Sequence, residues 1–375
     1  MAQSQLDLLR LEGSPRDIGY SHGKQGGERI RSFLEIIVKH GIESIPDFTR
    51  EKALSHAKRY VPFIEDYAPD LAEEIRGIAE GANIQLEEAY LLQLRAELTQ
   101  LTIENESTPE GCTSFALPSS MTEDGEVCIG QNVDLSPFYK DFGVMLHIKP
   151  DKGPAILCYS QIGTVAHAGV NSAGIGLALN AVYSSDWRPG VPRPVLYRLI
   201  LEQGITSEVL KVFIDAKRAS SCNYLIANKS GEIKDIEVTA QHHSVMDGPE
   251  DLMVHANHFV HPSMVKFEKR PKDKLENSKF RESRLRQLVY TCEGKVSLGK
   301  LKEFLTDHER YPTAICTHAE GNPWNFMTIA SIIAQPADGI MHVSLGQGCK
   351  NEYVKYSLYN VSGKVGQNSE KKVLV

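Results

Sequence analysis

The hydrophobic pattern of this chain changes its period at Gly111-Cys112, and that change limits the folds that the chain can adopt. Before Gly111 the apolar residues recur at helical spacing, as they do over residues 30–38. After Cys112 they alternate with polar residues, beginning with residues 113–117, which is typical of a β-strand. A block of helices followed by strands, then helices and strands again, predicts a layered α+β fold with largely antiparallel sheets.

The spacing of apolar residues and turn signals divides the chain into elements. In the first block we expect helices over residues 14–38, 49–67, 70–82 and 86–98, followed by a polar linker over residues 99–109. In the second block we expect strands over residues 113–117, 127–132, 144–148, 155–159, 165–170, 175–182, 223–227, 233–238, 253–259, 326–334, 340–345 and 354–358, and helices over residues 195–203, 207–217, 278–290 and 298–308.

Two local features make these expectations more specific. The first helix contains glycines at positions 19, 23, 26 and 27, which indicate either close packing against another helix or a broken first turn. The turn signal Asp124-Gly125 predicts that the first two strands after Cys112 form a hairpin. The end of that hairpin, at residues 132–134, would return close to Cys112.

Composition excludes several classes of function. The 375 residues carry a net charge of −7, so there is no basic excess with which to bind nucleic acid. No apolar run reaches membrane-spanning length and the N-terminus has no signal peptide pattern, so we expect a cytoplasmic protein without a membrane partner. The seven cysteines form no CxxC pair, which suggests neither a disulfide framework nor a thiolate zinc site.

A cysteine directly after a glycine can attack the peptide bond that joins them. Because Gly111 lacks a Cβ, the thiol of Cys112 can approach the Gly111 carbonyl. We predict cleavage there into residues 1–111, a helical segment, and residues 112–375, the catalytic unit. Cys112 would then carry both a thiol nucleophile and an α-amino group, whose pKa of about 7.7–8.0 in peptides suits a general base. The alternative is a buried, inert cysteine.

An ordered set of motifs raises the weight of the first interpretation. Gly111-Cys112-Thr113-Ser114 and the later stretch at residues 130–134 resemble the penicillin acyltransferase family, the acyl-coenzyme A:6-aminopenicillanic acid acyltransferases among the N-terminal nucleophile hydrolases. Further matching stretches follow the same order, at residues 19–23, 94–97, 169–174, 222–223, 254–258 and 311–316. The resemblance implies a four-layer αββα fold and self-cleavage between Gly111 and Cys112.

The resemblance also implies roles for individual residues. Cys112 would be the nucleophile, Asp134 would stabilise the site near the new amine, and Asn257 would donate to the oxyanion. Such a donor typically contributes about 10²–10³ in rate. From the residues alone, we would favour a strand-end turn carboxylate for Asp134 and an ordinary β-turn amide for Asn257.

The chain departs from the family pattern at one position. After Cys316, where the family commonly has an arginine that supports catalysis, this chain has Thr317 followed by His318. We therefore expect Arg95 and His318 as further site residues. For Arg95 the alternative is an ion pair with Glu97 on the surface of a helix.

The implied substrate is a linear amide or an acyl thioester such as an acyl-coenzyme A, whose acyl group passes through a thioester on Cys112 to water or an amine. Penicillins are not assumed as substrates. The resemblance implies neither a cofactor nor a metal. The cleaved fragments would form an αβ heterodimer, or the chain would form a homo-oligomer.

Two alternatives remain open from the sequence. Cys112 could pair with His255, His258 or His318 in an uncut thiol hydrolase of the Cys–His type. The histidines of His255-x-x-His258-x-x-His261 could bind zinc or nickel, although a strand would point the first two to opposite faces. Residues 186–190 could line an acyl pocket or form a plain loop, and we favour the loop.

Overall fold

Two β-sheets and two groups of helices make up the part of the chain that the computed structural model describes, which is residues 6–45, 47–98, 110–248 and 251–359. The strands are β1 (Leu8–Gly13), β2 (Glu110–Leu117), β3 (Cys128–Leu135), β4 (Gly143–Pro150), β5 (Ile156–Gln161), β6 (Gly169–Asn171), β7 (Ile175–Asn180), β8 (Cys222–Asn228), β9 (Ile233–Val238), β10 (His243–Asp247), β11 (Met253–His255), β12 (Met327–Gln335), β13 (Ile340–Leu345) and β14 (Val354–Ser357). The α-helices are α1 (Pro15–Ser44), α2 (Arg50–Lys58), α3 (Val61–Tyr67), α4 (Pro69–Ala82), α5 (Leu86–Leu92), α6 (Arg193–Leu201), α7 (Thr206–Asp215), α8 (Lys272–Tyr290) and α9 (Leu298–Phe304).

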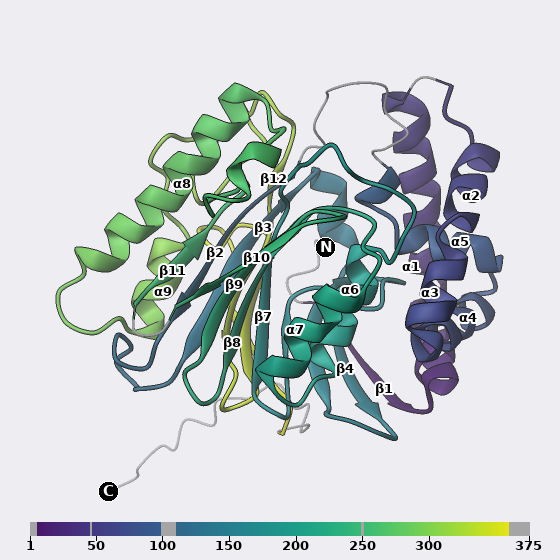
Figure 1. The fold of residues 1–375 in the computed structure, drawn as a ribbon, viewed down its shortest axis with the longest axis horizontal. Coiled ribbons are helices and arrows are strands. Elements are labelled where there is room, and N and C mark those ends of the chain that lie inside the picture. The colour runs from purple at the N-terminus through teal and green to yellow at the C-terminus, as the bar shows by residue number, and fades with distance from the viewer. Residues whose placement is uncertain (1–5, 46, 99–109, 249–250, 360–375) are drawn as a thin grey trace, which may run out of the picture.

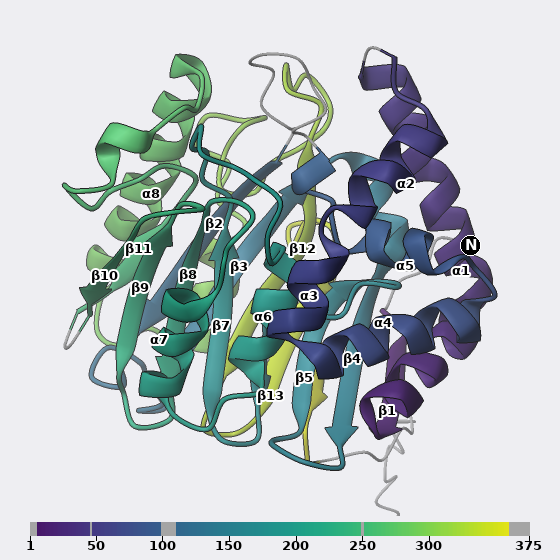
Figure 2. The ribbon, with the colours of Figure 1, turned by 45° about the vertical axis from the view of Figure 1, so that its right-hand side comes forward.

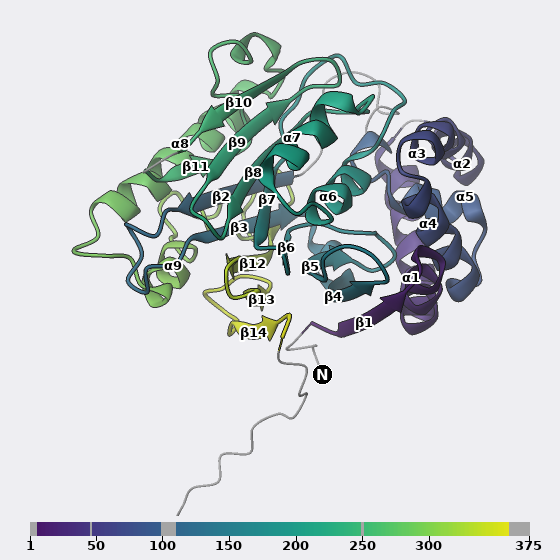
Figure 3. The same cartoon turned by 60° about the horizontal axis from the view of Figure 1, so that its bottom comes forward.

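The sheets lie face to face, with helices on both outer sides (Figure 1). In the described residues, one sheet has eight strands in the order β1-β4-β5-β6-β7-β8-β9-β10, and the other has six in the order β11-β2-β3-β12-β13-β14. Figure 2 shows α6 and α7 in front of the larger sheet, with α1 to α5 beside β4. In Figure 3 the smaller sheet lies between the larger one and the pair α8 and α9.

Three buried clusters hold these layers together. The first packs the helices, through residues such as Ile78 of α4, against the outer face of the larger sheet at Ile226. The second fills the space between the sheets and includes Val133 and Leu157. The third joins the smaller sheet, through Phe115, to α8 and α9. Helices thus cover the outer face of each sheet while the inner faces pack on each other, and the predicted four-layer αββα fold is confirmed.

The first helix packs unusually closely against α4. It begins with a capping box, in which the Ser14 side chain accepts from the backbone N–H of Asp17. A Cβ on Gly23 would lie 2.4 Å from the carbonyl oxygen of Ile78, and one on Gly77 would lie 2.4 Å from that of Arg16. The glycines of both helices therefore let the two backbones touch, as one of the two interpretations of the sequence predicted.

Some predicted elements were wrong in extent. The single helix expected over residues 49–67 is two helices, because Pro62 in the first turn of α3 has no N–H to continue a preceding helix. The helix expected over residues 86–98 ends at Leu92, and the strand expected over residues 165–170 is the shorter β6. The linker expected over residues 99–109 lies outside the described residues.

The structure also contains strands that the sequence analysis did not predict. The strand β1 pairs in parallel with β4, and β10 pairs with β9 at the far edge of the same sheet. The pairing of β1 with β4 joins segments that are far apart in the chain. No turn signal in the sequence could therefore predict it. Among the helices that the structure describes, none combines the length and the apolar character that crossing a membrane would need.

Candidate active site

Cys112 lies near the start of β2, and the register of the hairpin determines what surrounds it. The strands β2 and β3 are antiparallel, with Gly111 opposite Asp134 and Cys112 opposite Val133, so the predicted return of the hairpin to Cys112 is confirmed. Side chains alternate along a strand. Ser114, two residues on, donates to Asn180 of the larger sheet, so Cys112 belongs to the face between the sheets. Its side chain is 6% exposed.

Asn257 follows β11 and contacts the backbone of Cys112 directly. The N–H of Cys112 donates to its Oδ1 at 2.8 Å, while its Nδ2 donates to the carbonyl oxygen of Ala181 at 3.0 Å. The backbone N–H of Asn257 donates to the hydroxyl of Ser278 on α8. In the uncut chain, Asn257 therefore contacts Cys112 as an acceptor, through its side-chain oxygen. The role of Asn257 as a donor to the oxyanion stays a prediction.

Asp134 lies beneath the peptide bond that would be cut. A Cβ on Gly111 would be 3.2 Å from Asp134 Oδ2, so the missing side chain leaves room for the carboxylate. Thr328 donates to Oδ1 at 2.6 Å and Thr317 lies 3.4 Å from Oδ2. Burial raises the pKa of Asp134 to about 6, although the charge of Arg281 and the two threonine hydroxyls oppose that rise.

Arg281 on α8 is the residue of this site that the sequence analysis missed. Its Nη1 donates to the carbonyl oxygen of Cys112 and to the hydroxyl of Thr113, both at 2.7 Å. Its Nη2 donates to Asn257 Oδ1 at 2.8 Å, and its Nε donates to Asn277 one turn earlier. Burial lowers the pKa of Arg281, and the nearby carboxylate of Asp134 opposes that effect.

One signal in the sequence could have revealed this arginine. Arg281, Leu285 and Val289 recur four residues apart, and all three are buried on the face of α8 that packs on the smaller sheet. A charged residue inside such an apolar stripe needs a buried partner, because an unpaired buried charge is strongly destabilising. Here the partners are Cys112 and Asn257.

The structure places Arg95 at a cavity on the helical side of the larger sheet. Its guanidinium lies 5.7 Å from the centre of the Tyr139 ring. The cavity holds about 20 Å³, room for roughly one water, and the described residues that line it include His167, Arg193 and Tyr197 but not Cys112. Glu97, the expected ion-pair partner, accepts from the hydroxyl of Ser220 at 2.7 Å.

His318 lies in the loop between α9 and β12, where it is bonded to other residues of the loop. Its Nε2 is 3.0 Å from Nε2 of His308 and 3.7 Å from the sulfur of Cys316. Thr317, at the position of the expected family arginine, is the residue between Cys316 and His318 and turns toward Asp134. His318 is therefore next to a residue that touches the site.

The histidines of the alternative Cys–His mechanism bond elsewhere. His255 bonds the carbonyl oxygen of Ala256 through Nδ1 and Glu237 through Nε2 at 3.0 Å. Burial lowers its pKa, but the nearby carboxylates of Asp235 and Glu237 outweigh that effect and raise it to about 9. A histidine that is protonated at neutral pH cannot accept a thiol proton.

His258 is likewise committed to other groups. It bonds Ser278 through Nδ1 and lies 3.2 Å from Glu282 through Nε2. His261 bonds the hydroxyls of Ser244 and Ser263. Among the residues that the structure describes, these histidines do not converge into a group of metal ligands.

A row of aromatic rings and arginines extends from Asn257 along the edge of the site. Arg270 donates to the same Ala181 carbonyl oxygen as Asn257, and its guanidinium lies 4.8 Å from the centre of the Tyr183 ring. Tyr183 stacks on Trp187, with the ring centres 5.8 Å apart. Residues 186–190, for which we favoured a plain loop, thus contribute Trp187 to this row.

Together these contacts hold the Gly111-Cys112 peptide from several sides. The amide of Cys112 is bound by Asn257, its carbonyl by Arg281, and a carboxylate lies under Gly111. Such an arrangement can position a thiol nucleophile and stabilise charge that develops beside it.

Comparison with known proteins supports the resemblance. The family model for acyl-coenzyme A:6-aminopenicillanic acid acyl-transferase matches residues 120–350, more than half of the chain, which includes Asp134 and Asn257 and begins after Cys112. The 40 kDa form of the acyl-coenzyme A:6-aminopenicillanic-acid-acyltransferase of Emericella nidulans is 26% identical over 317 residues, 82% of this chain and 84% of the relative.

Two further relatives match over smaller shares of their own length. A protein of Archaeoglobus fulgidus is 25% identical over 343 residues, 80% of this chain but 57% of that protein. The beta-alanyl-dopamine/carcinine hydrolase of Drosophila melanogaster is 22% identical over 233 residues, 56% of this chain and 58% of the relative.

Among solved structures, a variant of the conjugated bile acid hydrolase of Clostridium perfringens aligns with a TM-score of 0.47 at 15% identity, covering 69% of this chain and all of that one. Penicillin V acylase of Agrobacterium tumefaciens aligns with a TM-score of 0.37 at 10% identity, covering 65% and 78%. The sequence matches carry the conclusion: the chain belongs to the acyl-coenzyme A:6-aminopenicillanic acid acyltransferase family.

Proposed function

We propose that this protein is a self-processing enzyme that cleaves or transfers the acyl group of a linear amide or an acyl thioester through a thioester on Cys112. The observation that carries the proposal is the convergence of Asn257, Arg281 and Asp134 on the Gly111-Cys112 peptide. Family membership adds a class of chemistry, acyl transfer, and the names of the relatives include both an acyltransferase and a hydrolase.

In the maturation step, the thiol of Cys112 attacks the carbonyl carbon of Gly111. The C–N bond breaks as the C–S bond forms, and the departing nitrogen takes the thiol proton, leaving a thioester and a free α-amine. Water then hydrolyses the thioester and returns the thiol. The products are residues 1–111, ending in a carboxylate, and residues 112–375, beginning with Cys112.

In the catalytic cycle, the new α-amine takes the proton of the same thiol. The thiolate attacks the acyl carbonyl of the substrate, and the amine passes its proton to the departing amine or thiol. Arg281 holds the carbonyl of Cys112 and the side chain of Asn257 in place. The thiol of Cys112 is therefore already positioned when the substrate binds. Water or a second amine then accepts the acyl group from the thioester.

Arg270 and the aromatic rings beside it suggest where the acyl chain would lie. Tyr183 and Trp187 stack on each other, and Arg270, which lies over the Tyr183 ring, donates to the same Ala181 carbonyl oxygen as Asn257. Aromatic surface of this kind suits an apolar or aromatic acyl group. Replacing Trp187 with Ala is therefore expected to raise KM for such substrates more than it lowers kcat.

The decisive experiment is the mass of the purified protein and of Cys112→Ala. We expect two fragments from the wild-type chain, one beginning at Cys112, and one uncut, inactive chain from the variant. Cys292→Ala is the matched control, because Cys292 is half-buried and follows the last turn of α8, in a cluster on the outer side of the smaller sheet. Activity is read with a panel of acyl amides and acyl-coenzyme A donors. Full activity from an uncut wild-type chain, or from Cys112→Ala, would exclude this mechanism.

A further inference from the structure

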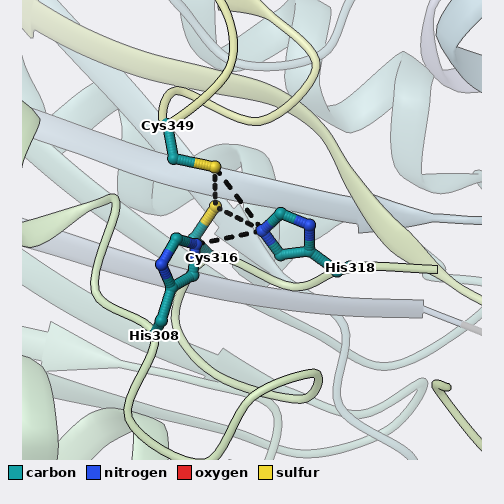
Figure 4. A group of neighbouring side chains, drawn as sticks. All are labelled: His308, Cys316, His318 and Cys349. Carbon is teal, nitrogen blue, oxygen red and sulfur yellow. Dashed lines mark hydrogen bonds between the residues drawn. The ribbon is translucent and has the colours of Figure 1, made fainter. Parts of the chain in front are cut away.

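A cluster of two histidines and two cysteines lies beside the site, on connections between secondary-structure elements. His308, Cys316 and His318 come from the loop between α9 and β12, and Cys349 comes from the connection between β13 and β14 (Figure 4). One atom from each residue, a ring nitrogen or a sulfur, lies within 4.8 Å of the others. The sulfurs of Cys316 and Cys349 point toward the ring nitrogens in Figure 4.

Three of the six distances between these atoms are close to those of a tetrahedral metal site, a fourth is shorter, and the other two are at most 4.8 Å. With Zn–S near 2.3 Å and Zn–N near 2.0–2.1 Å, tetrahedral angles require separations of about 3.8 Å for S···S, about 3.6 Å for S···N and about 3.4 Å for N···N. The two sulfurs are 3.6 Å apart. His318 Nε2 lies 3.7 Å and 3.5 Å from the sulfurs of Cys316 and Cys349, and 3.0 Å from His308 Nε2.

A disulfide does not fit these distances, whereas hydrogen bonds fit the four that are given, so the case for a metal rests on the set of donor atoms. A disulfide between Cys316 and Cys349 would need an S–S distance of about 2.05 Å, and the sulfurs are 3.6 Å apart. Two nitrogens and two sulfurs in a tetrahedron are a donor set that selects zinc among the common divalent metals.

We propose that His308, Cys316, His318 and Cys349 bind one Zn²⁺ ion in a closed, structural site. Both thiols lose their protons on binding and both imidazoles stay neutral, so no change of oxidation state is involved. Cys316 and His318 are buried, whereas His308 and Cys349 are exposed, so the ion can reach the site from solvent. The sequence analysis did not predict this site, because the spacing matches no common zinc motif and includes no CxxC pair.

The site would position the carboxylate under Gly111. Thr317, held between the ligands Cys316 and His318, faces Asp134 Oδ2, and its backbone N–H donates to Thr328 Oγ1 at 2.9 Å. Thr328 in turn donates to Asp134 Oδ1. Four zinc bonds would therefore fix the loop on which Asp134 depends, which makes the four ligands positioning residues rather than catalytic ones.

The test is the metal content of the full-length protein together with its spectrum after exchange of the ion for Co²⁺. We expect about one zinc ion per chain after dialysis, and a cobalt form with the intense visible bands of tetrahedral Co²⁺ and near-ultraviolet thiolate-to-cobalt bands. Cys349→Ser and His308→Ala, both at exposed ligands, should lose most of the zinc. Cys292→Ser and His342→Ala, outside the cluster, should keep it.

The wild-type cobalt spectrum decides the question even if the ligand variants fail to fold. A folded wild-type protein without zinc, whose added Co²⁺ gives no thiolate bands, would overturn the proposal. So would a Cys316–Cys349 disulfide found by mass spectrometry of the freshly purified, unreduced protein. Neither measurement depends on enzymatic activity. The zinc proposal can therefore be refuted while the proposed function stands, and the proposed function can be refuted while the zinc site is confirmed.

Discussion

Arg281 links several groups of the candidate site to one another. A single guanidinium bonds the carbonyl of Cys112, the hydroxyl of Thr113 and the side chain of Asn257. Its planar fork matches acceptors placed on two sides, which the single ammonium of a lysine cannot do. Cys112, the proposed nucleophile, and the side chain of Asn257 are thus held in one relative position.

Replacing Arg281 with Lys is expected to slow cleavage at Gly111 by roughly 10–100-fold, because the charge remains but the bidentate geometry is lost. The rate is followed by intact mass after synthesis of the chain. Arg284→Lys is the control, since Arg284 lies on the same helix and pairs with Asp307 at 2.7 Å. Cleavage of Arg281→Lys at the wild-type rate would show that the fork is dispensable.

Asp134 should make stability depend on pH in a defined window. Burial raises its pKa from 3.8 to about 6, so between these values the unfolded chain releases a proton that the folded chain keeps. The free energy of unfolding therefore falls as the pH rises through this window: the contribution is fully present below about 4 and lost above about 6. Asn at this position cannot titrate.

We expect Cys112→Ala to lose roughly 1–3 kcal/mol of stability relative to Cys112→Ala/Asp134→Asn as the pH rises from about 4 to about 7. Under the proposed mechanism the Cys112→Ala background stays uncut, so no new amine would alter the carboxyl group. Urea unfolding at several pH values measures the difference. A difference that does not change with pH, or that changes in the opposite direction, would contradict the raised pKa.

At the scale of elements, the contact between α1 and α4 shows how glycine sets the distance between helices. A Cβ on Gly23 would lie 2.4 Å from the oxygen of Ile78 and 2.7 Å from the backbone nitrogen of Ala82. Such a group meets backbone, which cannot rotate away as a side chain can. The helices would have to separate, and the buried cluster beneath them would lose contacts.

Gly23→Ala should therefore lower the free energy of unfolding by about 1–3 kcal/mol, the usual effect of overpacking. Gly27→Ala, one turn further along the same helix, is the matched control, because the nearest atom to its Cβ would be 3.4 Å away on the flexible side chain of Arg31. There the higher helix propensity of alanine should stabilise the protein by about 0.5–1 kcal/mol. Equal effects at both positions would argue against the close helix contact.

At the scale of the whole molecule, residues before Cys112 are part of the same folded body as those after it. The strand β1 pairs with β4 over its full length, and Glu74 of α4 forms a buried ion pair with Arg198 of α6 at 2.9 Å. Glu97 accepts from Ser220. Breaking a buried pair by removing one partner is strongly destabilising, so these contacts favour association after cleavage.

We accordingly expect the two fragments to elute together in size-exclusion chromatography under native conditions and to separate in denaturant. Cys112→Ala, as a single chain, should elute at the same volume. A fragment of residues 112–375 that elutes alone and folded would show that the interface does not survive the cut.

The sequence by itself determined the features that depend on residues close together in the chain. The change of hydrophobic period predicted the order of helices and strands, and the turn signal at Asp124-Gly125 predicted the hairpin in which Asp134 lies opposite Gly111. Local patterns suffice for both, because side-chain alternation and turn geometry act within a few residues.

Only the tertiary structure decided what comes together from far away. Arg281 meets Cys112 across 169 positions of sequence, and Cys349 meets Cys316 across 33. No spacing rule links such residues, because their distance depends on how α8 and the loops pack against the smaller sheet. The candidate nucleophile Cys112 could therefore be proposed from the sequence, whereas its contact with Arg281 and the cluster of His308, Cys316, His318 and Cys349 could not.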